Sequence, residues 1–82
     1  MYADHHHTVS IVDFERVNDK SVFVEVAGYD AEKGREFEGI VKFLDGMLYG
    51  DLVHNQRSTL SSSCRSLVRS KLLNDYQEGK FN

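Results

Sequence analysis

The sequence contains no proline and a single cysteine, and none of its apolar runs exceeds four residues. Without proline there is neither a proline-rich linker nor a cis-proline step in folding. Without a long apolar run, the sequence predicts neither a transmembrane helix nor the hydrophobic region of a secretory signal peptide. Cys64 has no second cysteine with which to form an intramolecular disulfide. Because small secreted domains generally depend on such cross-links, we expect a reducing, cytoplasmic location.

What the sequence does contain is typical of one small folded domain. Its 82 residues are 40% hydrophobic and 28% charged, a balance found in globular rather than disordered proteins. A chain of this length buries only about 60–65% of the surface that its unfolded form exposes, so its stability is expected to be small. We expect a flexible lead-in over residues 1–7, a single domain over residues 8–78 and a frayed end over residues 79–82.

The first two-thirds of the sequence predicts an antiparallel sheet. Residues 8–17 and 21–29 are rich in β-branched and aromatic side chains, which favour strands. Residues 18–20 between them are typical of a turn. A hairpin loop is predicted at residues 30–34, where Gly34 is free to adopt a positive φ.

The strongest local signal is Asp45-Gly46, which lies between apolar segments at residues 36–44 and 47–54. Asp-Gly suits the two-residue type I′ turn of a β-hairpin. The turn fixes a register with four predicted pairs: Leu44 with Met47, Phe43 with Leu48, Val41 with Gly50, and Gly39 with Leu52. Because side chains alternate across a strand, the hairpin has two distinct faces. One carries Phe37, Gly39, Val41, Phe43, Leu48, Gly50 and Leu52, and the other carries Ile40, Lys42, Leu44, Met47, Tyr49 and Asp51.

The last third predicts one amphipathic helix over residues 58–76. Apolar side chains recur there at helical spacing and form one stripe: Leu60, Cys64, Leu67, Val68, Leu72 and Tyr76. Ser58 or Thr59 can cap its start, and Gly79 lies just past its end. The predicted fold class is therefore α+β, a four-stranded antiparallel β-meander followed by one C-terminal amphipathic helix packed on one face.

Candidate chemical groups are present, but none forms a recognisable motif. The run His5-His6-His7 beside Asp4 contains metal-binding groups, yet adjacent residues on a flexible arm do not form a closed site, and no Cys or His pair elsewhere supplies the missing ligands. Cys64 and His54 invite a nucleophile–base pair, but Cys64 lies on the apolar stripe, where cysteine packs as a small hydrophobe. Acidic residues on the strands lack catalytic companions and are expected to be solvated: Asp13, Glu15, Asp19, Glu25, Glu36 and Glu38. We therefore predict no enzyme, no cofactor and no metal site.

Charge is unevenly distributed along the chain. Residues 1–51 carry eleven Asp and Glu against five Lys and Arg, whereas residues 52–82 carry two against five. The basic residues in and before the predicted helix are Arg57, Arg65, Arg69 and Lys71. Phosphate binding by these four makes a nucleic-acid-associated protein the alternative function. We expect them instead to pair with acids of the sheet or of a partner, because four charges are few and the whole chain has a net charge of −3.

The most informative feature for function is that both faces of the predicted sheet carry large apolar side chains. The second predicted strand carries Val22, Val24 and Val26 on one face and Phe23, Ala27 and Tyr29 on the other. The first carries Val9 and Ile11 on one face and Val12 and Phe14 on the other, and the hairpin adds Ile40, Leu44, Met47 and Tyr49 to its second face. One helix covers only one face, and monomers rarely leave large apolar patches in water. The N-terminal segment with Tyr2, a second copy, or another protein must cover the remainder.

The predicted function is therefore a non-enzymatic protein-interaction module. It is expected to be a homodimer or a small inhibitor or regulator of a larger protein, with Ile40, Leu44, Met47 and Tyr49 at the interface. We expect no membrane partner and no small-molecule substrate.

Overall fold

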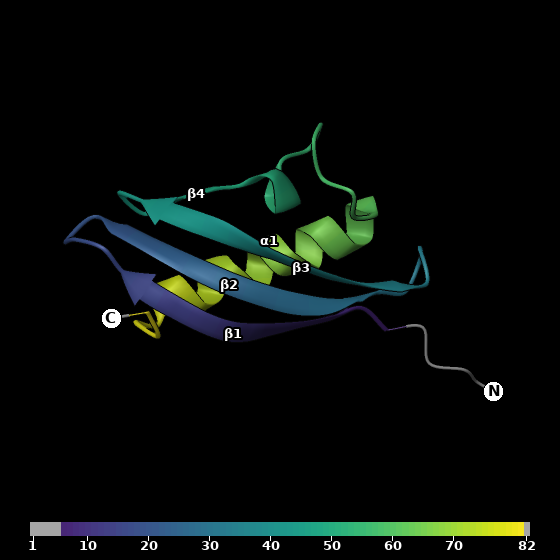
Figure 1. Ribbon diagram of the computed structural model, residues 1–82, viewed down its shortest axis with the longest axis horizontal. Helices are drawn as coiled ribbons and strands as arrows, with labels where there is room; N and C mark the ends of the chain where they lie inside the picture. Colours follow the sequence, from purple (N-terminus) through teal and green to yellow (C-terminus); the bar gives the residue numbers. More distant parts are fainter. Residues whose placement is uncertain (1–5, 82) are drawn as a thin grey trace.

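The computed structural model describes residues 6–81. Its elements follow in the order β1 (Thr8–Arg16), β2 (Ser21–Asp30), β3 (Arg35–Leu44), β4 (Met47–Tyr49), a short 3₁₀ helix η1 (Asp51–Val53) and α1 (Ser62–Gln77). The strands form a four-stranded antiparallel sheet in the order β1-β2-β3-β4, and α1 packs across one side of it (Figure 1). The predicted α+β meander with one C-terminal helix is confirmed.

The β3–β4 hairpin closes at Asp45 and Gly46. Both residues have positive φ, 52° and 79°, as a type I′ turn requires. The ladder confirms two of the predicted pairs: Leu44 with Met47, and Phe43 with Leu48.

The strand predicted over residues 47–54 is too long, because β4 ends at Tyr49. At Gly50 the backbone has a φ of 147° and turns into η1, so the predicted pairing beyond Tyr49 does not form. The side chain of Leu52 nevertheless packs over Gly39, within 3.5 Å of where a Cβ on that glycine would lie. Leu52 and Gly39 are thus close together on the helix side of the sheet, although they are not paired in the ladder.

Replacing Gly46 with valine is expected to lower the free energy of unfolding by at least ~1 kcal/mol, because a β-branched residue is strained at positive φ. Space is not the obstacle: the nearest atom to a Cβ at this position is Cε2 of Tyr76, at 3.8 Å. Urea denaturation measures the effect. Asp45→Asn is the matched control, since asparagine also tolerates a positive φ. Equal midpoints for both variants contradict the turn.

Helix α1 begins at Ser62 and is capped by Ser61, not by Ser58 or Thr59 as predicted. The Ser58 hydroxyl instead organises the preceding loop. It donates a hydrogen bond to the carbonyl of Leu52 at 2.6 Å and accepts one from the N–H of Leu60 at 3.1 Å. The predicted cap residue Ser58 therefore lies in the loop, four residues before the helix begins.

The core lies between α1 and the sheet. Its buried side chains come from both layers: Val22, Val24, Val26, Val41, Phe43, Val53, Leu60, Cys64, Val68, Leu72 and Phe81. Tyr76 stacks on Phe43 with ring centroids 4.4 Å apart. The predicted helical stripe is confirmed except at two positions: Leu67 is 38% exposed, and Leu60, although buried, precedes α1.

A β-bulge at Val12 changes the face on which the aromatic residue of β1 lies. The register against β2 shifts between Ile11 and Asp13, which leaves Val12 as the extra residue. Phe14 therefore lies on the helix side, where its ring meets that of Phe81 edge-on at a centroid distance of 5.4 Å. The prediction that Phe14 lies on the face opposite Val9 and Ile11 is wrong, because strict alternation fails at a bulge.

The expectation that the chain frays after α1 is wrong at Phe81, which is 2% exposed. Gly79, with a φ of 77°, reverses the chain. Its N–H donates to the carbonyl of Tyr76 at 3.1 Å, and the N–H of Lys80 donates to that of Asp75 at 3.0 Å. These are the two hydrogen bonds of a Schellman motif. The reversal places the last described side chain in the core.

Candidate protein-binding face

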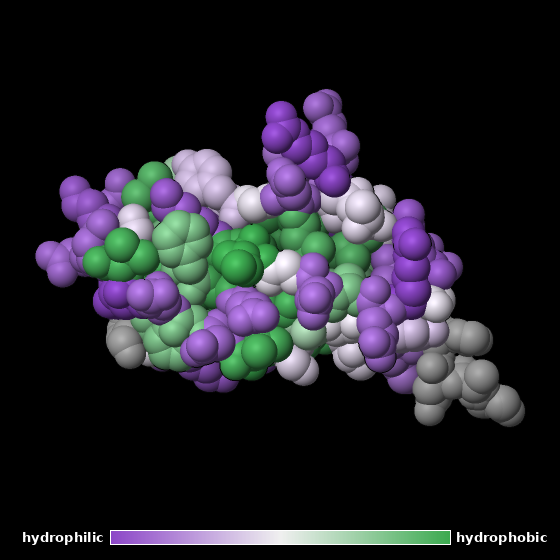
Figure 2. All heavy atoms as spheres, in the orientation of Figure 1, coloured by the Kyte–Doolittle hydropathy of each residue, from purple (hydrophilic) through white to green (hydrophobic). Residues whose placement is uncertain are grey.

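The side of the sheet that faces away from α1 is not covered by any element within residues 6–81 (Figure 1). We call this side the open face. Its residues follow from the strand registers: Thr8, Ser10, Asp13 and Glu15 in β1; Phe23, Glu25, Ala27 and Tyr29 in β2; Glu36, Glu38, Ile40, Lys42 and Leu44 in β3; Met47 and Tyr49 in β4. Figure 2 shows apolar side chains gathered over the strands on this side and polar ones around them.

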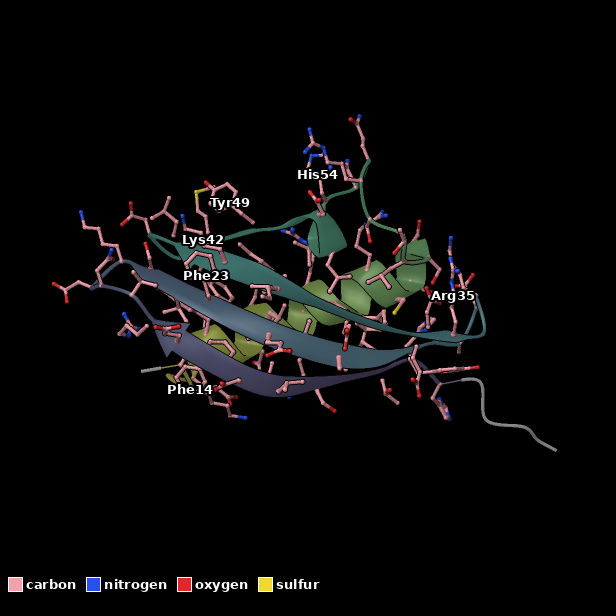
Figure 3. The ribbon with its side chains drawn as sticks, in the orientation of Figure 1. Phe14, Phe23, Arg35, Lys42, Tyr49 and His54 are labelled. Carbon is pink, nitrogen blue, oxygen red and sulfur yellow. The ribbon has the colours of Figure 1, made fainter. Side chains whose placement is uncertain are left out.

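Five large side chains form the apolar patch of the open face: Phe23, Ile40, Leu44, Met47 and Tyr49. Their exposed fractions run from 37% for Leu44 to 62% for Ile40. The registers place Phe23, Lys42 and Tyr49 in one row across β2, β3 and β4 (Figure 3). All four residues predicted for the interface therefore lie together. The β2–β3 register adds Phe23, which the hairpin alone could not place beside them.

Contacts within the apolar patch hold its side chains in place. The Lys42 ammonium lies 5.6 Å from the ring centroid of Phe23, a cation–π distance. The Tyr49 hydroxyl donates to the sulfur of Met47 at 3.6 Å. These contacts reduce the freedom that the side chains would lose on binding, which lowers the entropic cost of an interface.

Acidic side chains flank the apolar patch, and we call them the acidic margin: Asp13, Glu15, Glu25, Glu36 and Glu38. Lys42 is the one basic residue among the open-face positions defined above. Asp13 lies directly opposite Glu25 in the ladder, and like charges in such a pair repel each other. The acidic margin is therefore better suited to a basic partner than to a copy of itself.

The four basic residues proposed for nucleic-acid contact do not pair with acids of the sheet. Arg57 lies 3.8 Å from Asp51 of η1, and Lys71 lies 3.2 Å from Asp75 of α1. Within the described part of the chain, Arg65 and Arg69 form no ion pair with an acid. Two of the four thus form ion pairs, but with acids of η1 and α1 and not with the predicted acids of the sheet.

Cys64 is fully buried in the core, as predicted. Burial raises the pKa of its thiol to about 11, and the charges of Asp30 and Glu32 add to this. The side chain is therefore a protonated thiol at neutral pH. His54 is exposed in the loop after η1, where its Nδ1 accepts from the N–H of Gln56 at 3.0 Å. The two residues do not form a nucleophile–base pair.

Asp30, at the end of β2, is a carboxylate that is only 1% exposed and connects the sheet to α1. Its Oδ2 accepts from the Ser61 backbone N–H at 2.7 Å, and its Oδ1 from the Ser61 hydroxyl at 2.8 Å. The backbone N–H groups of Glu32 and Lys33 also donate to Oδ1, at 3.1 and 3.3 Å. Burial raises the pKa of Asp30, but the hydrogen bonds outweigh it and hold the pKa below its ordinary value. Sequence reasoning missed this role, because an Asp at the start of a predicted hairpin loop is usually a solvent-exposed turn residue.

His7 is anchored between the β2–β3 loop and α1. Its Nδ1 accepts from the N–H of Ala31 at 3.0 Å, and its Nε2 lies 2.8 Å from Oγ of Ser63. Because Nδ1 accepts, Nε2 carries the proton and donates to Ser63, whose hydroxyl in turn donates to Glu32. The lead-in expected to be flexible is thus held at its last residue. Residues 1–5, with His5, lie outside the described residues.

Comparison of the chain with protein-family models, curated proteins and solved structures finds no match. Within residues 6–81, no helix is both long enough and apolar enough to cross a membrane.

Proposed function

We propose that this chain is a non-enzymatic protein-interaction module that binds a partner through the open face. The observation that carries the proposal is the apolar patch, whose five large side chains are each between 37% and 62% exposed. On the other side of the same sheet, by contrast, the apolar side chains of Val22, Val24 and Val41 are almost completely buried beneath α1. The free, buried Cys64 supports action in a reducing compartment such as the cytoplasm.

The size of the apolar patch supports an interface that extends onto the acidic margin. With their exposed fractions, its five side chains offer on the order of 500 Å². A standard protein–protein interface buries about 800 Å² on each partner. The remaining area comes from neighbouring residues, and on the β1 side these are Asp13, Glu15 and Glu25.

Charge favours a different protein over a second copy as the partner. A two-fold dimer that used the acidic margin would bring carboxylates from both copies together, at a cost in repulsion and desolvation. A larger protein with basic side chains beside an apolar groove complements both parts of the open face. The chain would then act on that protein as a small inhibitor or regulator.

Replacing Tyr49 with aspartate is expected to weaken the interaction at least tenfold (about 1.4 kcal/mol), because it places a charge within the apolar part of the interface. The matched control is Leu67→Asp, which alters an apolar residue of similar exposure on α1. Sedimentation at micromolar concentration detects self-association. Capture from lysate by the wild type and by each of the two variants detects other partners. The proposal is contradicted if the wild type and both variants behave identically, that is, if none of them dimerises and no protein is captured only by those with an intact apolar patch.

Nucleic-acid binding is the second candidate, favoured by Arg65 and Arg69, which lie four residues apart on α1. Phosphate binding weakens steeply with salt, whereas an apolar interface changes little. We expect no appreciable binding of DNA or RNA at physiological salt. Micromolar or tighter binding that Arg65→Glu/Arg69→Glu abolishes would reverse the order of the two candidates.

A further inference from the structure

Three potential metal ligands from distant parts of the chain meet at one end of the sheet. His7 precedes β1, Asp30 ends β2, and Cys64 lies in the first turn of α1. An imidazole nitrogen, a carboxylate oxygen and a sulfur, one from each residue, all lie within 4.8 Å of one another. Asp30 and Cys64 are fully buried, and the His7 side chain is only 16% exposed. Nitrogen, oxygen and sulfur donors together are the ligand set of Zn²⁺.

Two observations separate this cluster from ordinary packing. The Cys64 sulfur is completely buried, faces the other two ligand atoms, and takes part in no hydrogen bond with any residue from 6 to 81. The Asp30 carboxylate carries its charge without a Lys or Arg partner in the same range, and its nearest basic group is Nδ1 of His7 at 3.7 Å. A cation between the three residues would give the sulfur a partner and neutralise the buried carboxylate.

Hydrogen bonds already orient two of the three ligands. The Asp30 oxygens are fixed by donors from Ser61, Glu32 and Lys33. The Nε2–H of His7 is directed at Ser63, which leaves Nδ1 as the coordinating atom. Outer hydrogen bonds of this kind hold the ligands of known metal sites and fix the histidine tautomer.

We propose that His7, Asp30 and Cys64 form a three-ligand Zn²⁺ site, with water in the fourth position. Zinc binds Nδ1 in place of the Ala31 N–H, which gives up its hydrogen bond. At Cys64 the S–H bond breaks, a sulfur–zinc bond forms, and the proton passes to solvent, so no oxidant or reductant is needed. The bound ion ties the N-terminal segment, β2 and α1 together. The proposal is independent of the open face.

Cobalt(II) is the direct probe, because it occupies zinc sites and gives a near-ultraviolet charge-transfer band only when a thiolate is a ligand. We expect this band when Co²⁺ is added to the full chain at neutral pH, and its loss when Zn²⁺ displaces the cobalt. Zn²⁺ should also raise the melting temperature, and a chelator should reverse the rise. A wild-type protein that takes up cobalt without this band overturns the proposal, whatever the variants do.

Variants identify the ligands. His7→Ala lies outside every strand and helix, and is expected to weaken Zn²⁺ binding roughly tenfold or more. Cys64→Ser should abolish the cobalt band, and circular dichroism checks that this variant is folded. The control, His5→Ala/His6→Ala, keeps His7 and should retain both the band and the affinity. An affinity that His7→Ala leaves unchanged, or a band lost in the control, refutes the assigned ligand set.

Discussion

Replacing Phe81 with alanine is expected to lower the free energy of unfolding by about 3–5 kcal/mol, as large-to-small changes at buried phenylalanines do. The ring is 2% exposed and lies against Phe43 and Phe14, with centroid distances of 5.8 and 5.4 Å. Its removal leaves a cavity between α1 and the sheet. For a domain of this size the loss is a large part of the whole stability, so the variant should be partly unfolded at room temperature.

Phe81→Leu is the matched control, because it keeps most of the buried volume and should cost less than about 1.5 kcal/mol. Urea denaturation followed by circular dichroism gives both values. Equal stability of the Ala and Leu variants, both close to the wild type, would show that the chain end is not part of the core.

The fold was predictable wherever local chemistry decides the structure. Asp45-Gly46 suits only a few turn types, and the alternation of side chains around it defines both hairpin faces without knowledge of the rest of the molecule. The errors arise where tertiary contacts override local pattern. The bulge at Val12 moves Phe14 to the helix side, and the reversal at Gly79 brings Phe81 into the core.

The candidate sites differ in how far the sequence could predict them. Four members of the apolar patch belong to one hairpin, so alternation alone placed them together. Phe23 joins them through the β2–β3 register, which depends on the loop that Asp30 organises. The cluster of His7, Asp30 and Cys64 has no sequence signature, because each ligand comes from a different element and only the packed helix brings them together.

Replacing Asp30 with alanine is expected to lower the free energy of unfolding by about 2–4 kcal/mol. The substitution removes the acceptor of four hydrogen bonds, from the backbone and hydroxyl of Ser61 and from the N–H groups of Glu32 and Lys33. Without the carboxylate these four donors have no protein partner, and unpaired donors away from water destabilise the folded state. Asp30→Asn keeps the shape and part of the accepting capacity, and should cost less.

The comparison with Asp30→Asn also predicts how stability depends on pH. The folded pKa of Asp30 is lowered below its unfolded value of 3.8. A carboxylate with a lowered folded pKa stabilises the protein fully above the unfolded pKa, and this contribution is lost as pH falls through the folded pKa. The wild-type advantage over Asp30→Asn should therefore be constant near neutral pH and shrink below about pH 4. His7, Glu32 and Cys64 face the residue in both proteins, and groups that do not interact with Asp30 contribute equally to the two denaturation curves. An advantage that stays constant down to about pH 2 would show that the charge of this carboxylate does not stabilise the fold.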